Sequence, residues 1–317
     1  MKPIRLAVVG AGIMGSNHVR VANSLPDISV AAVVDIDRSR AEALAATCGA
    51  AVFTSVDDID VPIDAAVIAA PTAFHVDAAS SLAARGAHLL VEKPLAIDIA
   101  GAKEIIRVCA ESGVVLAVGH IERFNSAVAE LARFLDEPLH IDASRISPYS
   151  PRIGDGVIAD LMIHDIDAVL SLAGPSVSVR HASGVVRCVH GEAEDLASVV
   201  AVLDNDWTVH FSTSRLGQSK TRRIEVTQRD SVVVADLLQQ SIVIHRMTRH
   251  EYLGESGTTY RQSSVTEVPF LENRGEPLAR ELSHFAECVR TGASPLVTGT
   301  DGLRALQVVE FIRRSVL

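Results

Sequence analysis

The sequence predicts an α/β protein that joins a doubly wound parallel sheet to a second, α+β domain with an open, mostly antiparallel sheet. Between residues 4 and 118, short apolar runs alternate with helical segments, which is the pattern of a parallel sheet covered by helices. After residue 120 the apolar runs follow one another across short turns, which indicates antiparallel pairing. We therefore expect a cofactor-binding domain at residues 1–120. Residues 121–317 should form a substrate-binding and oligomerisation domain, with the last helices as candidates for packing back on the first domain.

The first predicted strand, residues 4–9, runs into the glycine-rich segment Gly10-Ala11-Gly12-Ile13-Met14-Gly15. In a strand–turn–helix context, Gly10 permits the tight turn and Gly12 lets a pyrophosphate approach the backbone. Gly15 lets the following helix pack close to the strand, and the free N–H groups at the start of that helix point at the phosphates. The expected cofactor contacts from this segment are Gly10, Gly12, Ile13, Met14 and Gly15.

The second predicted strand, residues 30–34, ends at Asp35. Asp35 follows Gly15 by about twenty residues, where the Rossmann dinucleotide fold places the acid that binds the adenosine ribose hydroxyls. A carboxylate there repels a 2′-phosphate, so we expect NAD rather than NADP, although Arg38 and Arg40 are close enough in sequence to soften that preference. The alternative is that Asp35 caps the next helix, a role that Asp37 can also fill.

Thr72 and His75 follow another buried strand, residues 65–70. Because ligands bind at the carboxyl ends of parallel strands, both residues should face the nicotinamide half of the cofactor. The alternative for His75 is a histidine in the first turn of a helix, exposed to water.

The stretch His88-Leu89-Leu90-Val91-Glu92-Lys93-Pro94 is a buried strand that ends in an acid, a base and a proline. The residue before a proline is pushed out of the helical region, so Lys93 should be extended at the strand end. It would then lie on the floor of a ligand crevice, with Glu92 beside it. The alternative is a Lys-Pro turn on the surface.

A strongly apolar helix, residues 157–172, carries Asp160 and His164. Their i, i+4 spacing puts both side chains on one face, where the carboxylate could orient the imidazole as a general base. A structural hydrogen-bonded pair or a buried core histidine remains the alternative. Asp165 and Asp167 point to other faces and are expected to be structural or surface residues. We expect no metal site, because no further ligands cluster here.

The remaining segments and the bulk composition narrow the possible functions. An open sheet leaves one face to cover, which favours a homodimer or homotetramer formed through the second domain. The net charge of −10 argues against nucleic-acid binding. Four scattered cysteines without a CxxC pair indicate neither zinc nor disulfides. Without a visible signal peptide or a membrane span, a cytoplasmic location is expected.

Three motifs together resemble the glucose–fructose oxidoreductase / inositol dehydrogenase / MocA family: the glycine-rich segment, Glu92-Lys93-Pro94, and Asp160 with His164. The resemblance extends over essentially the whole chain, including the closing segments around Glu276-Pro277-Leu278 and Asp301-Gly302-Leu303. It implies an N-terminal Rossmann domain, a C-terminal open-sheet domain, NAD(P), and oxidation of a sugar or cyclitol hydroxyl. It also implies that Lys93, Asp160 and His164 are the catalytic residues.

A narrower resemblance is to UDP-N-acetylglucosamine 3-dehydrogenases. It is carried by Gly119-His120-Ile121-Glu122-Arg123-Phe124-Asn125, by the loop Ser147-Pro148-Tyr149-Ser150-Pro151-Arg152-Ile153, and by His164-Asp165-Ile166-Asp167, with Ser126 where that branch has a proline. This branch implies oxidation of the 3-hydroxyl of a UDP-N-acetylhexosamine. Guanidinium groups bind phosphate bidentately, so the candidate diphosphate partners are Arg123, Arg145 and Arg152. The alternative is that these are ordinary surface or interdomain arginines.

The expected chemistry is hydride transfer to the nicotinamide. His164, oriented by Asp160, takes the hydroxyl proton, and Lys93 donates a hydrogen bond to the same oxygen. The sequence leaves open whether Lys93 or His164 is the proton acceptor. Two alternatives also stay open: an inositol or simple-sugar dehydrogenase, and a non-catalytic NAD-sensing regulatory protein, which would not need all three residues.

Overall fold

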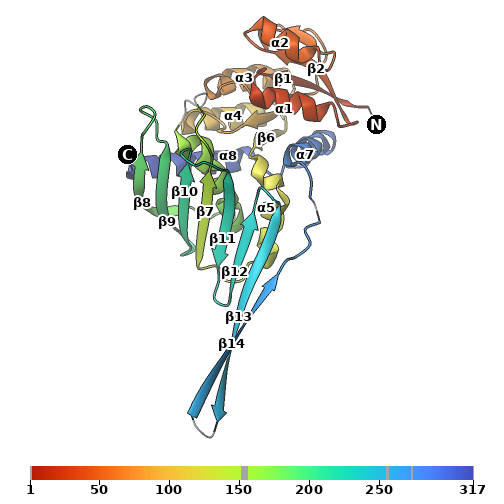
Figure 1. Ribbon diagram of the computed structural model, residues 1–317. Helices are drawn as coiled ribbons and strands as arrows, with labels where there is room; N and C mark the ends of the chain where they lie inside the picture. Colours follow the sequence, from red (N-terminus) through yellow and green to blue (C-terminus); the bar gives the residue numbers. More distant parts are fainter. Residues whose placement is uncertain (1, 151–155, 255–256, 273, 317) are drawn as a thin grey trace. The chain divides into compact units, whose positions relative to one another are not determined.

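The structure is a computed structural model that describes residues 2–150, 156–254, 257–272 and 274–316 (Figure 1). The chain forms two compact units. The first unit comprises Met1–Phe124 and Gly275–Gln307, and the second comprises Asn125–Arg274 and Val308–Leu317.

The first unit is built on a parallel six-stranded sheet of order β3-β2-β1-β4-β5-β6. Its strands are β1 (Ile4–Val9), β2 (Ile28–Val34), β3 (Ala51–Phe53), β4 (Ala65–Ile68), β5 (His88–Glu92) and β6 (Leu116–Gly119). Its helices are α1 (Ile13–Ala22), α2 (Arg38–Ala45), α3 (His75–Ala84), α4 (Ile99–Glu111) and α7 (Pro277–Thr291). The strand order reverses between β1 and β4, which is where open α/β sheets bind ligands. This arrangement confirms the predicted doubly wound sheet.

Both faces of this sheet are buried, because successive residues of one strand join different apolar clusters. In β1, Leu6 and Val8 pack in a cluster that includes Phe285 of α7. Ala7 and Val9 belong to the cluster on the other face. A strand covered on both sides must be apolar at every position, which explains the continuous apolar runs in the sequence.

The second unit is built on an eight-stranded sheet of order β14-β13-β12-β11-β7-β10-β9-β8, in which only the β7–β10 pair is parallel. Its strands are β7 (His140–Ile146), β8 (Val179–Arg187), β9 (Leu196–Leu203), β10 (Thr208–Ser214), β11 (Thr221–Thr227), β12 (Ser231–Asp236), β13 (Ser241–Gly254) and β14 (Gly257–Glu267). The predicted open, mostly antiparallel sheet is therefore confirmed.

Two details of the second unit differ from the sequence prediction. The strand β7 is not predicted, and the helix expected over residues 157–172 is instead a π-helical turn, Ile158–Met162, followed by α6, Ile163–Ala173. The helix α5 (Ser126–Leu131) also belongs to this unit, and α8 (Gly299–Val316) contributes its last residues to it.

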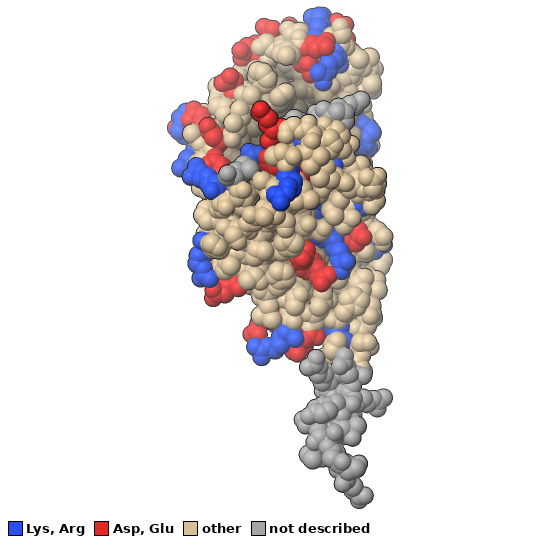
Figure 2. All heavy atoms as spheres, turned by 60° about the vertical axis from the view of Figure 1, so that its left-hand side comes forward, with Lys and Arg blue, Asp and Glu red and all other residues tan. Residues whose placement is uncertain are grey.

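The face drawn in Figure 2 carries acidic and basic side chains interspersed among uncharged ones. Proteins that bind nucleic acid through phosphate contacts instead gather Lys and Arg into a patch or stripe. Within the described part of the chain, no helix is both long and apolar enough to cross a membrane.

Candidate active site

The glycine-rich turn, the end of β2 and the end of β4 line one cleft of about 630 Å³ within the first unit. This cleft lies at the carboxyl ends of the parallel strands, where the sequence analysis placed the dinucleotide. The predicted contact residues in its lining are Gly10, Gly12, Ile13, Met14 and Asp35. Thr72 is half-buried and begins a short 3₁₀ helix directly after Pro71, which also lines the cleft.

The three glycines of the turn have different surroundings. Gly10 has φ +99°, and a Cβ there would lie 2.6 Å from the carbonyl oxygen of Ala69. A Cβ on Gly15 would lie 1.8 Å from the carbonyl oxygen of Gly10, so both positions exclude a side chain. At Gly12 the nearest atom is 3.7 Å away, in the Arg40 guanidinium. The open space at Gly12 is therefore a cradle that a ligand can enter, and the residues fit a dinucleotide.

Asp35 connects the glycine-rich turn to the end of β2. One of its carboxylate oxygens accepts a hydrogen bond from the Ala11 N–H at 2.7 Å, and the other accepts from the Asp37 N–H at 2.9 Å. Asp37, not Asp35, caps α2, because its side chain accepts from the first N–H groups of that helix. Each oxygen of Asp35 can still accept a second hydrogen bond from a ribose hydroxyl.

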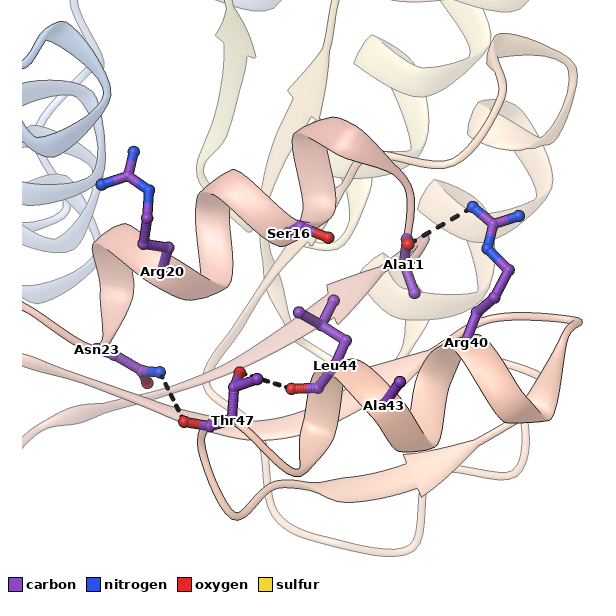
Figure 3. A pocket seen from close by; sticks show the side chains of 8 residues that line it. All are labelled: Ala11, Ser16, Arg20, Asn23, Arg40, Ala43, Leu44 and Thr47. Carbon is purple, nitrogen blue, oxygen red and sulfur yellow. Dashed lines mark hydrogen bonds between the residues drawn. The ribbon is translucent and has the colours of Figure 1, made fainter.

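Arg40 lies next to the same turn, and its guanidinium donates to the Ala11 carbonyl oxygen at 3.5 Å (Figure 3). It lines both the dinucleotide cleft and a second hollow of about 620 Å³ between α1 and α2. Of the two arginines that could accommodate a 2′-phosphate, Arg40 is thus the one that reaches the cleft lining.

The strand β5 ends at Glu92, and Lys93 follows it, half-buried, beside the buried carboxylate. The Nε2 atom of His18, on α1, lies 2.8 Å from Oε1 of Glu92. The backbone N–H of Lys93 donates to Oε2 of Glu92 at 3.3 Å. Burial opposes ionisation of Glu92, but the His18 hydrogen bond and the charges of His18 and Lys93 outweigh it, so the pKa of Glu92 is lowered. Lys93 therefore stands next to a carboxylate that keeps its negative charge.

Glu281, on α7, is a functional candidate that the sequence analysis did not single out. It is 2 % exposed, and among the described residues neither of its carboxylate oxygens has a hydrogen-bond partner. Burial, and then the charge of Glu92, raise the pKa of Glu281 well above its ordinary value. The signal was available in the sequence, because Glu281 interrupts the apolar i, i+3, i+4, i+7 stripe formed by Leu278, Leu282 and Phe285.

His75 is held inside the first unit. It is only 1 % exposed, and its two ring nitrogens lie 2.9 Å from the Ala70 carbonyl oxygen and 3.2 Å from that of Leu95. Burial lowers the pKa of His75. Because the ring links the segment after β4 to the segment after Pro94, it is not exposed to water, so the alternative of an exposed first-turn histidine is wrong.

In the second unit, Asp160 lies in the π-helical turn and His164 in the first turn of α6. Both residues are half-buried, and the Nδ1 atom of His164 is fully enclosed. The two side chains therefore come from one continuous helical segment. A π-helical turn in such a segment is uncommon and is often found at functional sites.

The three arginines proposed for a diphosphate have different environments. Arg145 is buried and forms a fork with Asp165, with N–O distances of 2.8 to 3.1 Å, so its guanidinium is engaged inside the second unit rather than presented to a ligand. Arg123 is half-buried in the first unit and donates to the Leu296 carbonyl oxygen at 3.4 Å. Arg152 lies outside the described residues.

The loop before the helical segment that carries Asp160 and His164, described up to Ser150, presents an aromatic ring. Tyr149 is 41 % exposed and stacks on His190, with ring centroids 3.7 Å apart and planes inclined by 21°. The guanidinium carbon of Arg215 lies 5.8 Å from the centroid of the Tyr149 ring. Among the described residues, no group of three or more His, Cys, Asp or Glu side chains is arranged to hold a metal ion.

Comparison with known proteins identifies the family. Residues 4–120 match the family described as "Oxidoreductase family, NAD-binding Rossmann fold", and residues 148–316 match "Oxidoreductase family, C-terminal alpha/beta domain". The UDP-N-acetylglucosamine 3-dehydrogenase of Acidithiobacillus ferrooxidans is 29 % identical over 315 residues, which cover 99 % of this chain and 97 % of the relative. The scyllo-inositol 2-dehydrogenase (NAD(+)) of Bacillus subtilis is 29 % identical over 322 residues, covering 96 % and 92 %.

Solved structures give the same result. The structure of UDP-N-acetylglucosamine 3-dehydrogenase from Acidithiobacillus ferrooxidans superimposes with a TM-score of 0.86 at 28 % identity, covering 100 % of this chain and 98 % of that one. Both domains, the dinucleotide cleft and the full-length similarity to dehydrogenases therefore agree. The chain belongs to the glucose–fructose oxidoreductase / inositol dehydrogenase / MocA family and is an NAD-dependent oxidoreductase that acts on a CH–OH group.

Proposed function

We propose that this dehydrogenase oxidises the 3-hydroxyl of a UDP-N-acetylhexosamine, with NAD as the hydride acceptor. The observation that carries this proposal is the similarity to UDP-N-acetylglucosamine 3-dehydrogenase, which extends through both domains in sequence and in structure. A similarity confined to the Rossmann domain would support only the identity of the cofactor. Because it includes the second domain, it also bears on the substrate.

The exposed ring of Tyr149 supports a nucleotide sugar over a free cyclitol. A uracil base is planar and stacks on aromatic side chains, whereas a cyclitol has no planar face. The stack on His190 and the nearby Arg215 guanidinium hold the Tyr149 ring in one place, so little entropy is lost when a base binds. Replacing Tyr149 by Ala should therefore raise KM for the UDP-sugar with little change in kcat, while Tyr149→Phe should preserve KM.

In the first unit, the glycine-rich turn would hold the pyrophosphate and Asp35 the adenosine ribose. NAD, when bound, supplies the acceptor for a hydride from the sugar carbon. Glu92 acts as a positioning residue, because its Oε2 accepts the Lys93 N–H while its Oε1 is held by His18.

We assign three side chains to the reacting hydroxyl. Lys93 donates a hydrogen bond to the oxygen and stabilises the negative charge that develops on it. His164 takes the hydroxyl proton, and Asp160 holds the imidazole in the orientation that this transfer needs. The alternative assignment has Lys93 as the proton acceptor.

A second candidate function is oxidation of inositol or a simple sugar, which is favoured by the equally full-length similarity to scyllo-inositol 2-dehydrogenase. The test is to incubate the purified protein with NAD and, separately, UDP-N-acetylglucosamine, UDP-N-acetylgalactosamine, myo-inositol, scyllo-inositol and glucose. We expect NADH to form at high kcat/KM only with a UDP-sugar. Efficient turnover of a cyclitol would replace the first proposal by the second. NAD binding without turnover of any sugar would favour a regulatory protein instead.

We also propose that a second copy of this chain covers the outer face of the eight-stranded sheet, giving a homodimer or homotetramer. Val200 on β9 is 47 % exposed, whereas its neighbours Val199 and Ala201 are buried on the inner face. Val185 on the adjacent β8 shares the outer face and is also exposed. Light scattering should give a dimer or larger, and Val200→Asp should shift the equilibrium toward monomer. A monomer at every concentration would contradict this proposal.

A further inference from the structure

The loop between β8 and β9 reaches the start of the helical segment that carries Asp160 and His164. Its residue Glu194 is 5 % exposed and accepts hydrogen bonds from two N–H groups at the start of this helical segment. The Glu194 backbone carbonyl accepts from the Val157 N–H at 3.0 Å, and its carboxylate Oε1 accepts from the Ile158 N–H at 3.4 Å. The first N–H groups of a helix have no partner within the helix, so Glu194 caps this one from a distant part of the chain.

The capping carboxylate is held tightly on two sides. A Cβ on Gly156, just before the helical segment, would lie 2.1 Å from Cδ of Glu194, so a glycine is needed for this close approach. From α8, a guanidinium nitrogen of Arg313 donates to the same Oε1 atom at 3.2 Å. The carboxylate therefore lies between the positive end of the helix dipole and a full positive charge.

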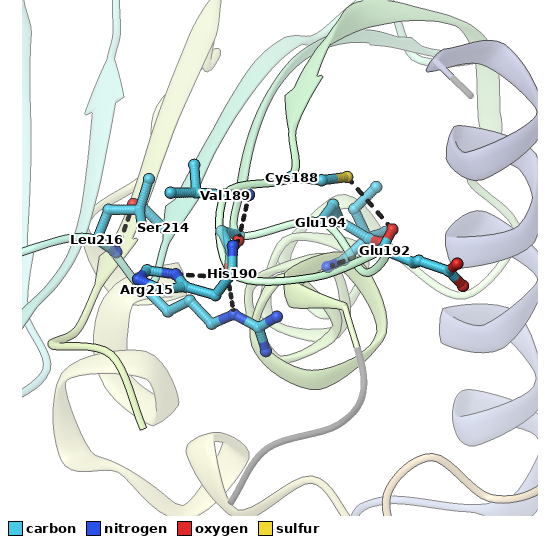
Figure 4. Close-up of polar contacts among 10 residues, drawn as sticks. Cys188, Val189, His190, Glu192, Glu194, Ser214, Arg215 and Leu216 are labelled. Carbon is cyan, nitrogen blue, oxygen red and sulfur yellow. Dashed lines mark hydrogen bonds and ion pairs between the residues drawn. The ribbon is translucent and has the colours of Figure 1, made fainter. Parts of the chain in front are cut away.

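The loop that presents Glu194 is itself fixed (Figure 4). The neighbouring residue, Asp195, is buried, accepts from the N–H groups of Val189 and His190 at 2.6 and 2.8 Å, and pairs with Arg215. Burial opposes ionisation of Asp195, but the backbone hydrogen bond from His190 and the Arg215 guanidinium outweigh it, so its pKa lies well below the usual range. Glu194 thus acts from a rigid support rather than from a mobile loop.

We propose that Glu194 is a positioning residue for the dehydrogenase reaction, because it holds the π-helical turn Ile158–Met162 in register. A π-turn contains one more residue than an α-turn, so its relaxation to an α-turn would rotate the residues before the turn relative to those after it by one helical position, about 100°. Asp160 lies inside the turn, so it would rotate relative to His164 by part of that angle. Fixing Val157 and Ile158 at the start of the turn blocks this rotation. The inference rests on the proposed assignment of Asp160 and His164 to the reacting hydroxyl.

The experiment measures kcat and KM for both substrates in graded variants of the full-length protein. Glu194→Ala should lower kcat at least about tenfold, since small misplacements of reacting groups have large effects on rate. Glu194→Gln should recover part of the loss, because its amide oxygen can still accept from the Ile158 N–H. Arg313→Gln should resemble Glu194→Gln. In all three, KM for NAD should stay within about twofold of wild type, because NAD binds to the first unit.

Matched controls separate positioning from general damage. Glu192→Gln changes an exposed acid two positions away in the same loop, and Arg314→Gln changes the neighbouring arginine, which pairs with Glu310 at the surface. Both should retain wild-type kcat. Thermal melts of every variant report the folded fraction, so that kcat is expressed per folded enzyme.

The close approach of Gly156 gives an independent test. Gly156→Ala must displace the Glu194 carboxylate, so it should lower kcat by itself but add little to Glu194→Ala, which has already removed that group. In a double-mutant cycle the two effects should therefore be strongly non-additive. Additive losses would overturn the proposal, because they would mean that Gly156 and Glu194 act separately.

The outcome for His164→Ala distinguishes this inference from the proposed function. If His164→Ala is nearly inactive while Glu194→Ala and Arg313→Gln turn over like wild type, the positioning role is refuted and the catalytic assignment stands. If His164→Ala keeps wild-type kcat, the catalytic assignment fails and the positioning role fails with it. Loss of kcat in His164→Ala and in the Glu194 series, with normal controls, supports both.

Discussion

The two units hold their buried acids in different ways. In the second unit, Asp165 and Asp195 are each matched by an arginine inside the same unit. In the first unit, Glu92 is matched by a histidine, and within the described residues Glu281 has no hydrogen-bond partner at all. An arginine stays charged and fixes the charge of its partner, whereas a histidine or an unpaired carboxyl can change protonation state. The comparison indicates that Asp165 and Asp195 are held by arginine pairs, whereas Glu281 is buried without a hydrogen-bond partner among the described residues and has a raised pKa.

The largest expected effect breaks a structural pair. Arg145→Met should lower the free energy of unfolding by about 3–5 kcal/mol, because it removes the guanidinium that forms a fork with the buried Asp165 carboxylate. The double variant Arg145→Met/Asp165→Leu should recover most of that loss. Arg180→Met, which breaks the exposed pair with Asp206, should cost no more than about 1 kcal/mol. Urea denaturation measures the free energy of unfolding of all three variants. If Arg145→Met is as stable as wild type, the buried pair is not structural.

The next effect concerns catalysis. Lys93→Ala and His164→Ala should each reduce kcat at least about a hundredfold, the scale of a positioned acid–base group or hydrogen-bond donor to a developing charge. NAD affinity, measured by fluorescence titration, should change little in His164→Ala. Lys103→Ala, an exposed lysine on α4, serves as the control. To identify the proton acceptor, kcat is measured as a function of pH. The acceptor is the residue whose replacement removes the fall in kcat at low pH. Near-normal turnover in His164→Ala would remove the histidine from the mechanism.

A smaller effect concerns the partly exposed acid of the first unit. Wild-type protein should bind NAD more tightly than NADP, because the Asp35 carboxylate repels a 2′-phosphate. Asp35→Asn should weaken NAD binding by about 1.5–3 kcal/mol, the range for hydrogen bonds to a charged group, and should improve NADP binding. Isothermal titration with both cofactors measures this. If wild type binds NADP more tightly, Arg40 at the cleft lining outweighs Asp35, and Arg40→Ala should then reverse the preference.

A pH-dependent effect tests whether the pKa of Glu281 is raised in the folded protein. Its pKa is raised in the folded state, so ionisation costs the folded protein stability as the pH rises above the ordinary carboxyl range. Glu281→Gln removes this titration. The variant and wild type should have similar stabilities near pH 4, and the advantage of the variant should grow with pH, at most by about 1.4 kcal/mol per pH unit. Parallel stability curves for the two proteins would show that the pKa of Glu281 is the same in the folded and unfolded states.

The sequence predicted the features that depend on local backbone geometry. The glycine-rich turn, the end of β2 at Asp35 and the end of β5 before Lys93 are each specified by neighbouring residues, so they could be located without a structure. Features that depend on distant pairing could not. The strand β7 was missed because its inward positions are Ile141, Ala143 and Arg145, and the arginine breaks the apolar alternation. Its pairing with Asp165 helps to make that position compatible with a core.

The same limit applies around the candidate site. The burial of His75 could not be predicted because its two carbonyl partners come from segments on either side of it in the sequence, 5 and 20 residues away. The π-helical turn was predicted as an ordinary helix, since an apolar run does not distinguish four from five residues per turn. The Glu194 cap was missed because the loop that carries it lies far from the helix in sequence. The catalytic assignment of Lys93, Asp160 and His164 stays a prediction.

The close contact between Gly119 and Glu92 limits how this protein can be recombined with its relatives. A Cβ at position 119, the last residue of β6, would lie 2.9 Å from Oε2 of Glu92 on the neighbouring strand. Any side chain there would push the carboxylate away from His18 and from the Lys93 N–H. A chimera that takes β5 from one parent and β6 from another therefore loses the hydrogen bond between Glu92 and the Lys93 backbone N–H, unless both parents have Glu and Gly at these two positions. When segments are exchanged between relatives, the ends of β5 and β6 must therefore be transferred together.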